Sequence, residues 1–196
     1  MEVELAELLQ RKRAYAPYFC LKDDKAGTER GVVSDWLFAR YGCPEEHFVR
    51  LQSSPEDPPD VVLLDKEGGH HGIEVTELVD GPTIRACDKS QLVFVKEFAD
   101  GELSQLVLRR ISDKSANPFK RGPFASKRLL IYSDEPTIAF CPDIDFLTRF
   151  PSSEQHTFDE IWFVIPPEVN TSGGEPENPY CRIFPILTNC VRQPHT

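Results

Sequence analysis

The sequence predicts an α/β protein in which helices cover a mixed β-sheet. Short runs rich in β-branched and apolar residues alternate along the chain with amphipathic segments of helical periodicity. The 196 residues are 40% hydrophobic and 28% charged, which is sufficient for a packed core. The 17 prolines gather in loops and in the last third, which favours short strands over a helical bundle.

The first half of the chain predicts two helices followed by three strands. Thr28 is the expected N-cap of the second helix, and Gly42 follows its last apolar residue. Two β-rich runs flank a polar turn, which predicts a hairpin, and Glu74 and Thr76 share one face of its second strand. The expected elements are helices at 2–15 and 28–41, a strand at 47–52, a loop at 53–59, and hairpin strands at 60–65 and 72–78.

The second half predicts a long helical region and then further strands. Leu103, Leu106, Val107 and Ile111 recur at helical spacing, and Pro118 comes after them. The expected elements are a mainly helical region at 84–116 with an interruption near residue 100, strands at 128–136, 160–167 and 180–186, a loop with a short helix at 137–150, and a polar loop at 170–179. We expect a single domain over residues 1–196.

The lack of a recognisable targeting signal and the spacing of the cysteines predict a cytoplasmic protein. No segment reaches the roughly 20 apolar residues that span a bilayer, so no membrane association is expected. The acidic N-terminus does not resemble a signal peptide. The six cysteines form no CxxC pair, which favours reduced, mostly buried thiols over a zinc site.

The charge is unevenly distributed. The net charge is −10, but residues 109–128 contain seven basic residues and one acidic residue and therefore carry +6. A concentrated basic segment on an acidic chain is typical of binding to a polyanion such as a phosphate backbone. A solvated helix end and loop would give the same pattern. The candidate phosphate contacts are Arg109, Arg110, Lys120, Arg121, Lys127 and Arg128.

Two acids of the predicted hairpin form a candidate metal site. Asp60 begins the first strand and Glu74 lies in the second, so their side chains can meet on paired strands. Two adjacent carboxylates repel each other unless a cation joins them, and Mg²⁺ prefers such oxygen ligands. The main-chain carbonyl of Val75 is a candidate third ligand. Acids also flank strands without binding metal, and that alternative stays open.

The same residues resemble a known family. Pro59-Asp60, a hairpin turn and Ile73-Glu74-Val75-Thr76 look like the motif of the PD-(D/E)XK phosphodiesterase superfamily, which has the restriction-endonuclease-like fold. The order of predicted elements over roughly residues 28–135 is similar to that fold. The N-terminal helix and the C-terminal strands would be elaborations of this core.

The resemblance implies roles for individual acids. Asp60 matches the metal-binding Asp of the family, and Glu74 matches the acidic first position of its second half-motif. The helix before the hairpin often supplies another acid, for which Glu29 is the best-placed candidate, with Glu45 and Glu46 as substitutes. A glutamate favoured by the helix dipole is the alternative explanation for Glu29.

Thr76 departs from the family pattern, because it occupies the position of the motif lysine. Some members take this lysine from the covering helix, and Lys114 resembles such a relocated lysine. Lys89 and Lys96 are the alternatives. Lys114 could also simply stabilise the C-terminal end of its helix.

Together these features predict a nuclease that depends on Mg²⁺ (or Mn²⁺) and cleaves nucleic acid, with DNA favoured. A homodimer is one expected assembly, because many such nucleases cut two strands. The alternatives are an inactive relative that serves as a binding or assembly module, and an unrelated α/β domain with incidental acids. His70 and His71 are expected in a solvated turn rather than at the metal, since neighbouring strand residues point to opposite faces.

Overall fold

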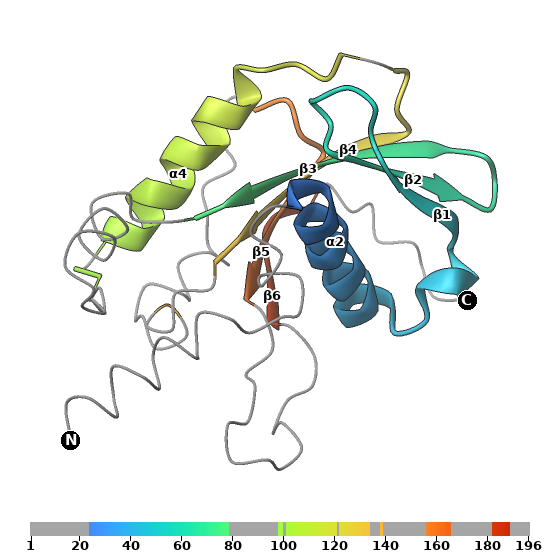
Figure 1. Cartoon of the computed structure of the whole chain (residues 1–196). Coiled ribbons are helices and arrows are strands. Elements are labelled where there is room, and N and C mark those ends of the chain that lie inside the picture. The colour runs from blue at the N-terminus through green and yellow to red at the C-terminus, as the bar shows by residue number, and fades with distance from the viewer. Residues whose placement is uncertain are drawn as a thin grey trace, which may run out of the picture.

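The computed structural model describes residues 24–78, 98–99, 101–120, 122–133, 138, 156–165 and 182–188. Figure 1 shows the helices and strands that these residues form. They are α2 (Lys25–Tyr41), the 3₁₀ helix η2 (Pro44–Glu46), β1 (Phe48–Ser53), β2 (Val61–Asp65), β3 (His70–Glu77), α4 (Glu102–Ser115), β4 (Ser126–Tyr132), β5 (Glu160–Ile165) and β6 (Arg182–Thr188).

The strands form one mixed sheet of six in the order β1-β2-β3-β4-β5-β6. The central strands β3, β4 and β5 are parallel to one another, and β1, β2 and β6 add to them in antiparallel pairs. Helix α4 lies between β3 and β4 in the chain, as expected for a connection between neighbouring parallel strands. This architecture confirms the predicted α/β class.

The two helices cover opposite faces of the sheet (Figure 1). Trp36 of α2 packs in one buried cluster with Val75 and Leu130, whereas Ile111 of α4 packs in another with Leu129 and Ile131. Because successive strand residues point to opposite faces, both faces of β4 are apolar. The same alternation places Glu74 on the α4 face, between Ile73 and Val75 on the α2 face.

Helix α2 begins three residues earlier than predicted. Asp24, not Thr28, is the N-cap, and its carboxylate accepts a hydrogen bond from the main-chain N–H of Gly27 at 2.7 Å. The Thr28 hydroxyl instead bonds to the Asp24 carbonyl. The predicted end of the helix is confirmed, since Gly42 adopts a positive φ of 69° and its N–H returns to the Phe38 carbonyl.

The predicted hairpin is confirmed, but its histidines are not in the turn. His70 and His71 are the first residues of β3, and the turn comprises residues 66–69. His71 bonds through its two ring nitrogens to Asp65 and to the Ser126 hydroxyl, both at 2.8 Å. The expectation of a solvated turn is therefore wrong for His71, which ties the hairpin to β4.

The strands at 128–136, 160–167 and 180–186 correspond to β4, β5 and β6 with shifted ends. The helix predicted at 2–15, most of 84–101 and the segments around 137–150 and 170–179 lie outside the described residues. Cys43, the one cysteine among the described residues, is exposed rather than buried. None of the described helices combines the length and apolar character needed to cross a bilayer.

Candidate metal centre

The site is built where β2 begins beside β3. The register pairs Val61 with Ile73, so the next residues outward are Asp60 and Glu74. The main-chain N–H of Val75 donates to Asp60 Oδ2 at 2.8 Å, while the Asp60 carbonyl accepts from the N–H of Ser54. Asp60 is only 6% exposed, so its carboxylate is held in one orientation by the backbone around it.

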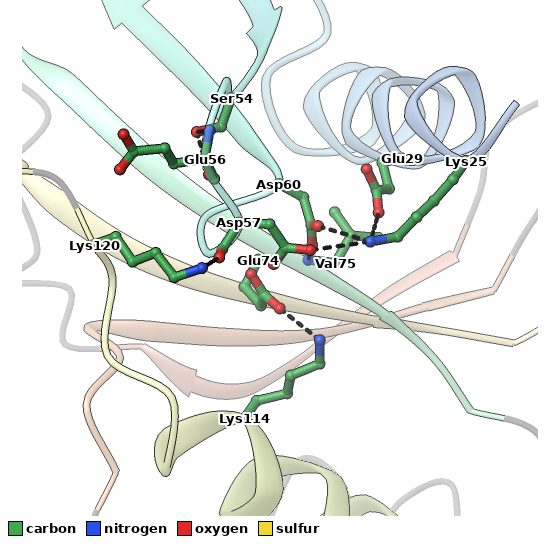
Figure 2. Close-up of polar contacts among 10 residues, drawn as sticks. All are labelled: Lys25, Glu29, Ser54, Glu56, Asp57, Asp60, Glu74, Val75, Lys114 and Lys120. Carbon is green, nitrogen blue, oxygen red and sulfur yellow. Dashed lines mark hydrogen bonds and ion pairs between the residues drawn. The ribbon is translucent and has the colours of Figure 1, made fainter.

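Three carboxylates converge at this point (Figure 2). Asp57, Asp60 and Glu74 each offer an oxygen, and these oxygens all lie within 4.8 Å of one another. The sequence predicted Asp60 and Glu74 but missed Asp57, which lies in the loop before β2. Nothing in the local pattern distinguishes Asp57 from the other acids of that loop, because the path of the loop decides where it points.

A buried oxygen of Glu74 lacks a hydrogen-bond partner within the described residues, and a cation could provide one. Glu74 is 3% exposed, and within the described part of the chain its Oε2 is buried without a hydrogen-bond partner. An ionised oxygen in this state is costly. Burial, and then the negative charge of Asp60, raise the pKa of Glu74 to about 7. A cation between Glu74 and Asp60 would supply the missing partner, so the three carboxylates could hold a metal ion.

Lys114 reaches Glu74 from the last turn of α4. Its Nζ lies 2.5 Å from Glu74 Oε1, whereas Oε2 is the oxygen without a hydrogen-bond partner. The structure therefore brings together the pair that the sequence proposed, although Thr76 occupies the motif position two residues after Glu74. The alternatives Lys89 and Lys96 lie outside the described residues.

A second lysine, which the sequence analysis missed, approaches from α2. Lys25 Nζ lies 3.1 Å from Glu29 Oε1, 3.3 Å from Asp57 Oδ2 and 3.5 Å from Asp60 Oδ1. Partial burial opposes its charge, but the hydrogen bond to Glu29 and the charge of Asp60 prevail and raise the pKa of Lys25 above its usual value.

Glu29 lies beside the three carboxylates rather than among them. It is buried in the second turn of α2, so the first-turn dipole explanation does not apply. Burial and the Asp60 charge raise its pKa to about 7, with Lys25 acting in the opposite direction. The substitutes Glu45 and Glu46 are exposed in η2, beyond the opposite end of α2.

The basic residues of the predicted segment, residues 109–128, lie in different environments. Arg109 is exposed and Arg110 is half-buried on α4, one turn before Lys114. The ammonium of Lys120 donates to the main-chain carbonyl of Asp57, and that of Lys127 lies 6.0 Å from the Phe119 ring centroid. Arg121 lies outside the described residues.

Arg128 does not fit the predicted role as a phosphate contact. It is 7% exposed, and its Nε donates to Glu160 Oε2 at 3.1 Å. Strand alternation turns Arg128 onto the α2 face, where Arg40 also pairs with Glu160. Although burial opposes it, the Arg40 hydrogen bond and the Arg128 charge lower the pKa of Glu160 to about 2. Arg128 therefore belongs to a buried ion cluster and not to a surface patch.

The fold and the site define the chain as an α/β protein with a mixed sheet and a candidate metal centre at the β2–β3 junction. A scan against protein-family models, a search of curated proteins and a search of solved structures each found no match. A functional assignment therefore depends on the site geometry.

Proposed function

We propose that this chain is a metal-dependent nuclease of the PD-(D/E)XK type, with a restriction-endonuclease-like core and a relocated lysine. The observation that carries the proposal is the meeting of Lys114 Nζ with Glu74 Oε1, at the point where three carboxylates converge. The order α2, β1, β2, β3, α4, β4 also follows the order expected for that core.

Asp60 and Glu74 are the proposed metal ligands, with Asp57 added by the structure. Asp60 Oδ2 is engaged by Val75, which leaves Oδ1 for the ion, and Glu74 contributes the orphaned Oε2. The Val75 carbonyl remains a proposed further ligand. A Mg²⁺ or Mn²⁺ ion held by these oxygens supplies positive charge to a phosphoryl oxygen and makes water a better nucleophile.

The residues of the chain then have distinct tasks. Glu74 Oε1 orients the Lys114 ammonium, which stabilises negative charge that develops on the phosphate. Thr76 cannot supply this charge, so the task falls to α4. Arg109, Arg110, Lys120, Arg121 and Lys127 are the proposed contacts to the phosphate backbone of a nucleic acid, with DNA favoured.

The test is cleavage of labelled DNA and RNA with Mg²⁺, Mn²⁺ or EDTA. Glu74→Gln and Asp60→Asn keep the shape of each side chain and remove its charge. We expect each to lower the cleavage rate at least about a hundredfold, because both remove charge that the reaction requires. The control Glu67→Gln removes an exposed charge from the hairpin turn and should cleave normally. Full activity of Glu74→Gln would rule out the proposed function.

One observation favours a second candidate, an inactive binding or assembly module. Lys25 and Lys114 already neutralise part of the acidic cluster, so the site can stabilise the fold as an ion-pair network alone. In that case Mg²⁺ and Mn²⁺ would leave the melting temperature unchanged, whereas ligation to the folded state raises it.

A further inference from the structure

We propose that Lys25 is a cation that exchanges with the metal. It neutralises the acidic site before the ion binds, is displaced from Asp60 by the ion, and then contacts a phosphate of the substrate. This inference rests on the proposed function, because it assigns Lys25 a role at the same metal centre.

Lys25 and a metal ion would use the same oxygens. Two of the three carboxylates in contact with Lys25, those of Asp57 and Asp60, also belong to the converging group. The overlap at Asp60 would lie at Oδ1, which faces Lys25, whereas Oδ2 already accepts the Val75 N–H. A ligand set that includes Asp60 Oδ1 therefore includes the oxygen that Lys25 contacts.

Electrostatic repulsion disfavours the binding of Mg²⁺ and the Lys25 ammonium to this oxygen at the same time. Mg²⁺ sits about 2.1 Å from its ligands, and the Lys25 ammonium lies 3.5 Å from Asp60 Oδ1. Two positive centres so close together repel each other strongly at the low effective dielectric of a half-buried site. The doubly charged ion gains more from Asp57 and Asp60 than an ammonium does, so Lys25 is the cation that leaves.

The side chain of Lys25 has more space to change its conformation than that of Lys114. It is the first residue of α2, and its side chain is 74% exposed, compared with 29% for Lys114. The two lysines approach the carboxylates from different directions, Lys25 from α2 and Lys114 from α4 (Figure 2). Lys114 is paired with Glu74 Oε1, which leaves Oε2 for the ion, so ion binding does not require it to move.

The charges of the site also match such an exchange. Asp57, Asp60, Glu74 and Glu29 together carry up to four negative charges against two lysines. A divalent ion would satisfy Asp57 and Asp60, two of the three carboxylates that Lys25 now contacts. The released ammonium would remain at the rim of the site on a flexible stem, where a phosphate oxygen is its natural partner.

The first experiment measures Mn²⁺ affinity by isothermal titration calorimetry of the full chain without substrate. We expect Lys25→Met to bind Mn²⁺ on the order of tenfold more tightly than wild type, because the ion no longer displaces a competing charge. Lys25→Arg should stay near the wild-type value. The control Lys66→Met, which removes an exposed lysine from the hairpin turn, should also do so.

The second experiment measures binding of a labelled DNA duplex in Ca²⁺ by fluorescence anisotropy. The loss of one phosphate contact in Lys25→Met should weaken binding roughly fivefold, whereas Lys66→Met should bind as wild type does. Equal binding by Lys25→Met and wild type would overturn the substrate part of the inference.

A third measurement needs no substitution. During a Mg²⁺ titration of the wild-type chain, the NMR signal of the Lys25 ammonium should move from its ion-paired position as the site fills. The exchange is overturned, and the metal site stands, in either of two cases. In the first, the wild type binds Mn²⁺ and Lys25→Met binds it no more tightly. In the second, the Lys25 signal stays fixed during the titration. Absence of Mn²⁺ binding to the wild type would instead overturn the proposed function itself.

Discussion

The two oxygens of the Glu74 carboxylate meet different environments. Oε1 faces the Lys114 ammonium, and Oε2 is buried without a partner in the described part of the chain. A buried oxygen without a partner costs about 1–3 kcal/mol, and a cation between Glu74 and Asp60 would remove this cost. The unpartnered Oε2 therefore supports the proposed role of Glu74 as a metal ligand.

Substitution of Lys114 separates its proposed catalytic task from metal binding. We expect Lys114→Met to lower the cleavage rate by about a hundredfold or more, because it removes the charge that stabilises the transition state. Mn²⁺ affinity should not fall, since no oxygen ligand is lost. Single-turnover cleavage and calorimetry measure the two effects.

The exposed Lys66→Met serves as the control for that experiment. A variant of Lys114 with wild-type cleavage would remove the relocated lysine from the mechanism. Lys89 and Lys96 would then be the next lysines to substitute.

The raised pKa values of Glu74 and Glu29, each about 7, make the metal-free fold sensitive to pH. The folded state holds protons that the unfolded state has released above pH 4.5, so stability falls as the pH rises from about 4.5 to 7. We expect the melting temperature in EDTA to decrease across this window. Glu74→Gln should make the decrease shallower, and an unchanged slope would contradict the assigned pKa of Glu74.

At the scale of elements, the loop after α4 is hydrogen-bonded to the loop that carries Asp57. The N–H of Lys120 donates to the Pro58 carbonyl, and its ammonium donates to the Asp57 carbonyl. The neighbouring Phe119 lies over Gly72, where a Cβ would come within 2.5 Å of its ring. β3 therefore needs glycine at position 72 so that this loop can pack.

Gly72→Ala tests that packing without removing a ligand. The added methyl group displaces Phe119, so we expect a loss of about 1–3 kcal/mol in the free energy of unfolding. Mn²⁺ affinity should fall severalfold as the Asp57 loop loosens. Calorimetry and urea denaturation measure both effects.

Gly122→Ala is the matched control, because a Cβ there meets only ordinary contacts at 3.5 Å or more. If Gly72→Ala retains full Mn²⁺ affinity, the loop after α4 does not position Asp57.

At the scale of the whole molecule, a buried ion cluster joins elements that are distant in the chain. Glu160 of β5 accepts hydrogen bonds from Arg40 of α2, Arg128 of β4 and the Trp162 indole. Arg40 also lies within 5.2 Å of three ring centroids, those of Trp36, Tyr41 and Trp162. This cluster fixes α2, and with it Lys25 and Glu29, to the sheet.

Glu160→Gln should destabilise the fold near neutral pH by about 3–5 kcal/mol, because it leaves the buried Arg128 and the half-buried Arg40 without their counter-charge. The folded pKa of Glu160, about 2, is below its ordinary value of 4.5. Its contribution is thus present above pH 4.5 and lost as the pH falls towards 2. Urea denaturation should show a smaller difference from wild type at pH 3 than at pH 7, and an equal difference would contradict the assigned pKa.

The local patterns of the sequence predicted much of this molecule. Alternation and turn residues specify the β2–β3 hairpin, and they place Asp60 beside Glu74. The family resemblance, rather than a local pattern, predicts a lysine from the covering helix, and Lys114 lies beside Glu74. Asp57 and Lys25 were missed because their positions depend on loop and helix packing, and Arg128 was misassigned because residues close in sequence lie on opposite faces of the sheet.

The most direct test of the central claim is a crystal structure with Mn²⁺, located by its anomalous signal. We expect one ion about 2.1 Å from oxygens of Asp60 and Glu74, with Lys114 still beside Glu74. An ion bound elsewhere, or no ion at a concentration that supports cleavage, would contradict the metal centre proposed for this protein.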